Sequence, residues 1–212
     1  LLTYAIMNAS SGAEVRQHIL NIAKPIMLHK GFSAVGLNEI LAAAGIPKGS
    51  FYHYFGSKEA FGEALLESYF DGYLAHLDNL FKHQAGTGAE RLMTYWRNWL
   101  HTQCADDPEG KCLAVKLGAE VSDLSEAMRT VLRHGTSQII ERLAGGIEAG
   151  LADGSLSGVA DPSHTAAILY ELWLGATLLE KIHRNRQPLE RAMVETRRML
   201  NLPPLEPSGA QS

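Results

Sequence analysis

The chain has few cysteines and no long apolar run, and these two absences exclude several classes of protein. Cys104 and Cys112 are the only cysteines among 212 residues, and they do not form a Cys-x-x-Cys pair. A disulfide scaffold and a cysteine-rich metal site are therefore excluded. No segment approaches the roughly 18 to 20 uninterrupted apolar residues that a membrane-spanning helix needs. Any role of the cysteines is expected to be that of thiols.

The first residues, LLTYAIMNASSG, lack the basic segment and the long apolar core of a signal peptide. We expect Met7 to be a natural start, residues 1–6 to be upstream sequence and residues 1–12 to form a disordered arm. A cytoplasmic location is the matching expectation.

The net charge of −4 lacks the strong positive sign that is common in DNA-binding proteins, but the charge is unevenly distributed. Residues 1–60 carry 5 Lys or Arg against 3 Asp or Glu, whereas the remaining residues carry 14 against 20. A mildly basic end on an acidic body is compatible with a small DNA-binding module attached to a domain of another function.

Apolar residues recur at helical spacing along the chain, and no segment alternates as a strand does. The pattern predicts an all-α fold of about nine helices. Early helices are expected at about 11–30, 37–44, 47–55 and 57–83, and the last two at about 162–185 and 187–201. The acidic row formed by Glu120, Asp123 and Glu126 is expected to be a solvated face.

The segment KGSFYHYFGSKEAF (48–61) follows a short helix and a glycine-containing turn, which is the order of a helix-turn-helix unit. Phe51 and Phe55 are four residues apart, so we expect both to face inward and to anchor the short helix. The rest of its surface must then face outward, as in a helix that enters the DNA major groove.

The residues expected to face outward have side chains that can contact DNA. Lys48 and Lys58 supply charge for phosphates at the two ends, and the small Gly49 and Ser50 allow the helix N-terminus to approach base edges. Tyr52 adds a hydroxyl on a rigid stem. The alternative is a solvated helix whose tyrosines have no role.

GFSAVGLNEILAAAGIPKGSFYHYFGSKEAF resembles the DNA-binding domain of TetR/AcrR-family transcriptional regulators. The resemblance implies a homodimer that binds palindromic operator DNA through an N-terminal head, and a helical body that holds an inducer pocket. The implied boundaries are 13–58 for the helix-turn-helix domain, 59–201 for the effector-sensing and dimerisation domain and 202–212 for a disordered tail. The dimer interface is expected at about 163–184 and 187–201.

The same resemblance assigns residues to DNA. Lys48, Ser50, Tyr52 and His53 fall at contact positions of the recognition helix, and Lys58 falls at a phosphate-binding lysine. The family often has Thr or Ser where this chain has Val35-Gly36. A phosphate contact there is therefore expected from the backbone, from Ser33 or from Asn38.

GKCLAVKLGAEVSDLSEAMR (110–129) and LWLGATLLEKI (172–182) resemble the N-ethylmaleimide-responsive (NemR-type) repressors. The resemblance implies that Cys112 is a reactive sensor and that Lys181 lies near it. The residues agree, since Cys112 is expected to open a helix, where free N–H groups stabilise a thiolate, and Lys111 adjoins it. The alternative is that Cys112 is a small buried hydrophobe. Cys104 is expected to be inert or auxiliary, although a disulfide between the two is conceivable.

Trp96 and Trp173 are candidates to line the effector pocket, but aromatic residues at helical spacing are more often core. A single Glu-x-x-His sequence, Glu180 to His183, is too little for a di-iron site, so no metal and no cofactor are expected. The leading hypothesis is thus a repressor released from its operator by an electrophile or small effector. A non-covalent drug-responsive repressor is the alternative, and a helical enzyme or metal protein is a distant one.

Overall fold

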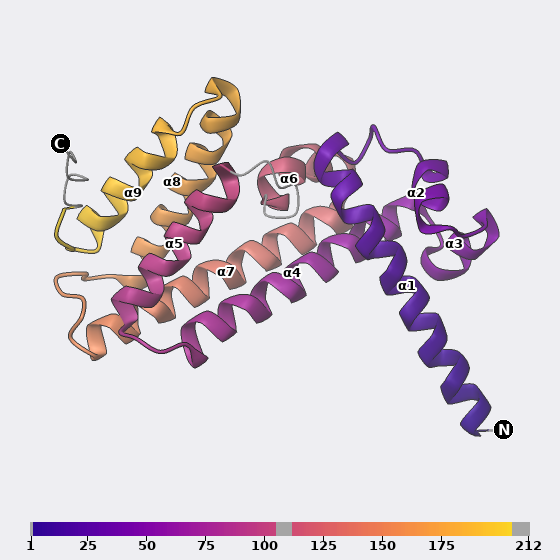
Figure 1. Ribbon diagram of the computed structural model, residues 1–212, viewed down its shortest axis with the longest axis horizontal. Coiled ribbons are helices and arrows are strands. Elements are labelled where there is room, and N and C mark those ends of the chain that lie inside the picture. The colour runs from indigo at the N-terminus through magenta and orange to yellow at the C-terminus, as the bar shows by residue number, and fades with distance from the viewer. Residues whose placement is uncertain (1, 105–111, 205–212) are drawn as a thin grey trace, which may run out of the picture. The chain divides into compact units, whose positions relative to one another are not determined.

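The computed structural model describes residues 2–104 and 112–204, which form nine helices and no strand (Figure 1). This confirms the predicted all-α fold. The helices are α1 (Leu2–Lys30), α2 (Leu37–Ala44), α3 (Lys48–Phe55), α4 (Lys58–His83), α5 (Gly88–Cys104), α6 (Leu113–Leu124), α7 (Glu126–Ala152), α8 (Pro162–His183) and α9 (Gln187–Met199). No helix in these ranges is long and apolar enough to cross a membrane.

The two ends of the chain differ from expectation. Helix α1 begins at Leu2, so the backbone of the expected disordered arm is helical. The physical reason is that residues 2–10 contain good helix formers and neither glycine nor proline. At the other end, Leu202 N–H donates to the Arg197 carbonyl at 2.8 Å, and the Pro203 carbonyl accepts from Arg197 Nε at 2.6 Å. The rest of the expected tail, from residue 205, lies outside the described residues.

The chain divides into two compact units, each built from two stretches of sequence. The first unit contains Leu1–Gly72 and Asp106–Gly135, and the second contains Tyr73–Ala105 and Thr136–Ser212. Helices α4 and α7 each begin in the first unit and end in the second. The first unit therefore contains α6 and the starts of α4 and α7 as well as the helix-turn-helix.

The first unit is closely packed at Gly62 of α4. A Cβ added there would lie 2.5 Å from Met128 Sδ of α7 and 2.6 Å from the ring of Phe32. Both neighbours are buried. The glycine thus lets α4 approach the α1–α2 loop and α7 more closely than any larger residue permits.

The core of the second unit is an aromatic cluster from α5 and α8. Trp96 and Trp173 are fully buried and stack with ring centroids 5.0 Å apart and planes inclined by 19°. Trp99 Nε1 donates to Thr177 Oγ1 at 2.9 Å, and Trp173 Nε1 donates to Thr196 Oγ1 of α9 at 2.8 Å. Large buried aromatic area and satisfied indole N–H groups together hold α5, α8 and α9 in place.

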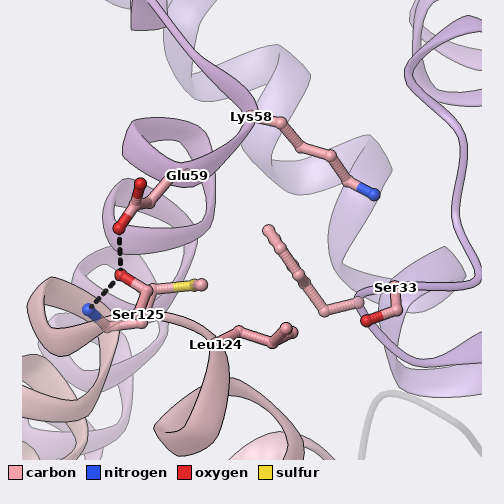
Figure 2. A pocket seen from close by; sticks show the side chains of 7 residues that line it. Ser33, Lys58, Glu59, Leu124 and Ser125 are labelled. Carbon is pink, nitrogen blue, oxygen red and sulfur yellow. Dashed lines mark hydrogen bonds between the residues drawn. The ribbon is translucent and has the colours of Figure 1, made fainter.

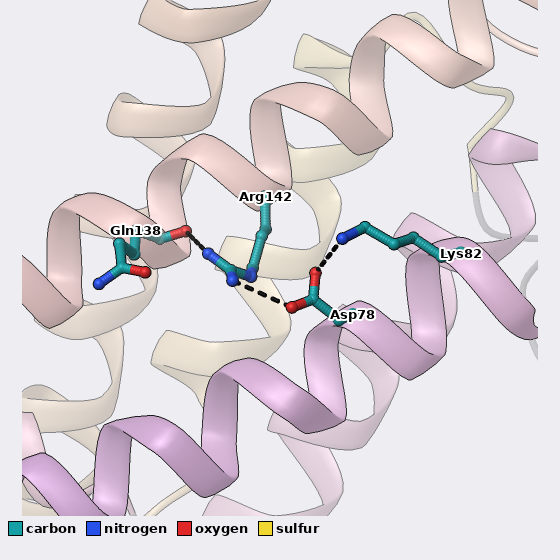
Figure 3. Close-up of polar contacts among 4 residues, drawn as sticks. All are labelled: Asp78, Lys82, Gln138 and Arg142. Atoms are coloured by element: carbon teal, nitrogen blue, oxygen red, sulfur yellow. Dashed lines mark hydrogen bonds and ion pairs between the residues drawn. The ribbon is translucent and has the colours of Figure 1, made fainter.

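A polar contact joins α4 and α7 within the second unit. Arg142 Nη2 donates to Asp78 Oδ2 at 3.0 Å and Lys82 Nζ lies 2.8 Å from Asp78 Oδ1, as Figure 3 shows. Arg142 Nη1 also donates to the Gln138 carbonyl at 3.2 Å. The hydrogen bond from Lys82, followed by that from Arg142, lowers the pKa of Asp78. The carboxylate therefore stays ionised and links the two helices.

Candidate functional site

The helix-turn-helix forms where the sequence predicted it. Helix α2 ends at Gly45, whose φ of 68° and ψ of 30° lie in the left-handed region that glycine adopts without strain. The Ile46 N–H donates back to the Leu41 carbonyl at 3.1 Å and closes the helix end. Helix α3 begins at Lys48 with Pro47 as its N-cap, one residue later than predicted.

The inward face of α3 consists of Phe51 and Phe55, as predicted. Both are buried, and their ring centroids lie 5.1 Å apart. Each also contacts the buried Phe61 of α4, at 5.3 Å from Phe51 and 5.1 Å from Phe55. Three rings in mutual contact anchor the two-turn helix, which is too short to be stable alone.

The opposite surface of α3 is exposed. Lys48, Gly49 and His53 are exposed, Ser50 is half-buried, and Tyr52 keeps 48% of its surface. A side chain as large as Tyr52 is usually more buried than this. This face therefore offers hydroxyl, imidazole and ammonium groups to a partner.

Two further predicted DNA contacts flank this surface. Asn38 is exposed in the first turn of α2, and Lys58 is half-buried at the start of α4. The Lys58 ammonium lies 5.0 Å from the centroid of the Phe32 ring. Ser57 Oγ accepts from the Ala60 N–H at 3.0 Å and caps α4.

Cys112 is the N-cap of α6 and is half-buried, so it lies at a helix start as predicted. The Tyr69 hydroxyl of α4 donates to its Sγ across 4.0 Å and accepts from the Leu113 N–H at 3.4 Å. Lys24 of α1 lies over the Tyr69 ring, with Nζ 5.6 Å from the centroid. The thiol thus has a phenol donor beside it, and its side chain makes no capping hydrogen bond to the first turn of α6. Lys111 and the Cys104 side chain lie outside the described residues.

Glu120 of α6 corrects the prediction of a solvated acidic row. Its carboxylate accepts from the Phe32 N–H at 3.1 Å and from the Ser33 N–H at 2.6 Å, at the end of α1. Burial raises the pKa of Glu120, but the hydrogen bonds from Ser33 and Phe32 outweigh this effect and leave the pKa below 4.5. Asp123 and Glu126 are exposed, as expected.

A second carboxylate links α4 to the junction of α6 and α7. Ser125 lies between those helices, and its hydroxyl donates to Glu59. The same hydroxyl accepts from the Met128 N–H at 3.3 Å in the first turn of α7. Glu120 therefore attaches α6 to the α1–α2 loop, and Ser125, just after the end of α6, attaches it to the start of α4.

Comparison with known proteins agrees with this architecture. Residues 19–65 match the model of bacterial regulatory proteins of the tetR family, and residues 88–195 match the tetracyclin repressor-like C-terminal domain. The chain belongs to the TetR family. The predicted family resemblance is thereby confirmed, and the similar curated proteins are transcriptional repressors and regulators.

Individual TetR-family relatives are similar over nearly the whole chain. The HTH-type transcriptional repressor NemR of Escherichia coli (strain K12) is 39% identical over 197 residues, which span 93% of this chain and 99% of NemR. The crystal structure of the reduced form of E. coli NemR has a TM-score of 0.84 and 40% identity, covering 90% of this chain and 98% of that one. The repressor DhaR of Mycobacterium sp. (strain GP1) is 34% identical over 83% of this chain and 87% of its own.

The predicted effector-sensing residues of this TetR-family chain are distributed over both units. Cys112 belongs to the first unit, whereas Lys181, half-buried on α8, belongs to the second. Their proximity stays a prediction. Trp96 and Trp173 are core residues of the second unit, and their contact with an effector likewise stays a prediction.

Sequence reasoning did not identify the partner of the thiol. Tyr69 follows Leu65 by four residues on the apolar face of α4, so its spacing suggested an ordinary core residue. The weak signal was its hydroxyl, because a buried tyrosine generally needs a polar partner.

Proposed function

We propose that the chain is a transcriptional repressor that binds a palindromic operator as a homodimer and is released when an electrophile modifies Cys112. The outward face of α3 supports the DNA-binding part. Its phenylalanines are committed to the core, so Lys48, Ser50, Tyr52 and His53 remain for bases and phosphates. Lys58 and Asn38 extend the phosphate contacts on either side.

The expected homodimer interface is the surface of α8 and α9. Large apolar side chains that keep between 37% and 64% of their surface lie on these helices: Ile168, Leu178, Leu179, Ile182 and Val194. Packing against a second copy would bury them. A two-fold symmetric dimer then presents two α3 helices to two half-sites.

The thiol chemistry follows from the environment of Cys112. Thiolate is the nucleophile of such a reaction, and the Tyr69 hydroxyl is the donor that lies beside the sulfur. In the reaction with N-ethylmaleimide, sulfur forms a bond to an alkene carbon and a proton from solvent reaches the neighbouring carbon. The adduct then occupies space beside Tyr69 and Leu113, which disturbs the start of α6. The role of Lys181 in sensing remains a prediction from the sequence resemblance.

The decisive experiment is an electrophoretic mobility shift with the DNA upstream of the protein's own gene. We expect N-ethylmaleimide to release wild-type protein and to leave Cys112→Ser bound. Cys104→Ser is the matched control and should respond like wild type. Release of the Cys112→Ser variant at the wild-type concentration of reagent would remove this thiol from the mechanism.

The DNA contacts are tested by salt dependence. Lys58→Ala should weaken specific and random DNA alike and reduce the slope of log K against log salt by about 1. Ser50→Ala should instead weaken the operator more than random DNA. Equal losses on both DNAs for Ser50→Ala would contradict its proposed position at base edges.

A non-covalent effector is the second candidate, favoured by one observation. Trp96 Nε1 is buried and has no hydrogen-bond acceptor among the described residues. A buried donor without an acceptor is unfavourable, and a ligand carbonyl or anion would supply one. Operator release by a non-reactive ligand from Cys112→Ser protein, abolished by Trp96→Phe, would support this candidate.

A further inference from the structure

A pocket of about 360 Å³ lies within the first unit, away from Cys112 along helix α6. It is bounded by the α1–α2 loop, the start of α4 and the junction of α6 and α7 (Figure 2). Phe32 and Met128 are buried at its base, whereas Leu124 keeps 56% of its surface. The pocket is thus apolar at depth and open to solvent at one side.

The two charged residues of the pocket differ in what they contact. The Glu59 carboxylate accepts the Ser125 hydroxyl, as Figure 2 shows. The Lys58 ammonium is directed to the other side of the pocket, lies 5.0 Å from the Phe32 ring centroid, and forms no ion pair with any described residue. The pocket therefore offers a ligand one ammonium group that no described carboxylate pairs with, on the side opposite the Glu59 carboxylate.

We propose that this pocket binds a small aromatic carboxylate. The carboxylate pairs with Lys58, and the ring lies against Phe32, Leu124 and Met128. The volume is sufficient, because an apolar cavity of about 150 Å³ already holds benzene. Repulsion from the Glu59 carboxylate directs the acidic end of the ligand to the Lys58 side of the pocket.

Binding has a consequence for DNA, and this consequence alone rests on the proposed function. Lys58 is the proposed phosphate contact, and one ammonium group cannot pair fully with a ligand carboxylate and a DNA phosphate together. An aromatic carboxylate therefore competes with the operator, independently of the thiol.

The first experiment is a ligand-observed NMR titration of the full chain with 2-naphthoate and with its neutral analogue 2-naphthamide at constant ionic strength. We expect naphthoate to bind at least about tenfold more tightly than the amide, since a charge-assisted pair is made only by the acid. Lys58→Met should abolish that difference while it keeps the aliphatic stem. Lys82→Met, on the same helix, is the matched control and should leave both affinities unchanged.

The Leu124→Gln substitution tests whether the aromatic ring of the ligand lies against Leu124. Leu124 is exposed, so the substitution preserves the fold, and it should weaken both naphthyl ligands. Naphthoate binding that is unaffected by Lys58→Met and by Leu124→Gln, or absent from the wild type, would overturn the proposal.

The second experiment measures operator affinity by fluorescence anisotropy with each ligand. Naphthoate should raise the operator Kd and naphthamide should not. The outcomes are separable: protein that fails to bind any operator contradicts the proposed function but leaves the ligand titration valid. Protein that binds operator yet does not bind naphthoate contradicts only the pocket.

Discussion

In the first unit, Glu120 links α6 to the α1–α2 loop and Glu59 links α4 to the α6–α7 junction, whereas in the second unit the buried Trp99 and Trp173 link α5, α8 and α9 by donating to buried threonines. Glu120 and Glu59 contact their partners near the surface. Trp173 and Thr196, in contrast, are fully buried. Water replaces the partners of an accessible carboxylate but has no access to a buried indole, so the contacts of the first unit are released at lower free energy.

The comparison predicts that the largest loss of stability follows truncation in the second unit. Trp173→Ala should reduce the free energy of unfolding by about 3–5 kcal/mol, because it removes the stack on Trp96 and leaves a cavity. Urea denaturation followed by circular dichroism measures it. Trp173→Phe keeps most of the ring and should lose clearly less; equal losses for the two variants would contradict the importance of the filled volume.

An intermediate loss of stability is expected at Gly62, a closely packed position of the first unit. Gly62→Ala should destabilise by about 1–3 kcal/mol, since the new methyl group overlaps Met128 and Phe32. Gly72→Ala on the same helix meets nothing within 4 Å and should instead stabilise by up to about 1 kcal/mol. Thermal unfolding of both variants distinguishes them, and a stabilising Gly62→Ala would contradict the packing.

The smallest loss is expected at Glu120. Glu120→Gln removes the charge but keeps one carbonyl acceptor for the Phe32 and Ser33 N–H groups, so the loss should be about 1 kcal/mol at neutral pH. Urea denaturation of wild type and variant at several pH values measures it. Asp123→Gln, on the exposed part of the same helix, is the control and should change little.

The pH dependence of this loss has a definite sign. The pKa of Glu120 is lower in the folded state than its ordinary value of 4.5, so the folded protein favours the ionised form. The contribution is present above the unfolded pKa and disappears as pH falls through the folded pKa. The difference between wild type and Glu120→Gln should therefore shrink in the acid range; a difference that grows on acidification would contradict the assignment.

The features that could be predicted from the sequence are those that depend on residues close together in the chain. Phe51 and Phe55 are one helical turn apart, and glycines bound the short helix, so its inward face and its limits followed to within one residue. The position of Cys112 at a helix start was also predictable, because it depends on residues close to it in the sequence. The upstream extension of α1 was missed because Asn8, Ser10 and Ser11 suggested a polar arm, although helix formers lie among and before them.

The unpredicted parts depended on residues far apart in the sequence. Glu120 accepts from the backbone of Phe32, 88 residues away, and Tyr69 contacts Cys112 from 43 residues away. Neither contact has a local signature, because a backbone N–H is present at every residue other than proline and a tyrosine at core spacing resembles any other.

The order of residues alone was sufficient to specify an all-helical chain, the position of the short helix α3 and the side of it that faces away from the core. These properties follow from periodicity, which acts over one or two turns of helix. The partners of Glu120, Ser125 and Cys112, and the pocket beside Lys58, arise only when separate helices pack together. Their physical basis is the distance between groups in space, which the spacing along the chain does not contain.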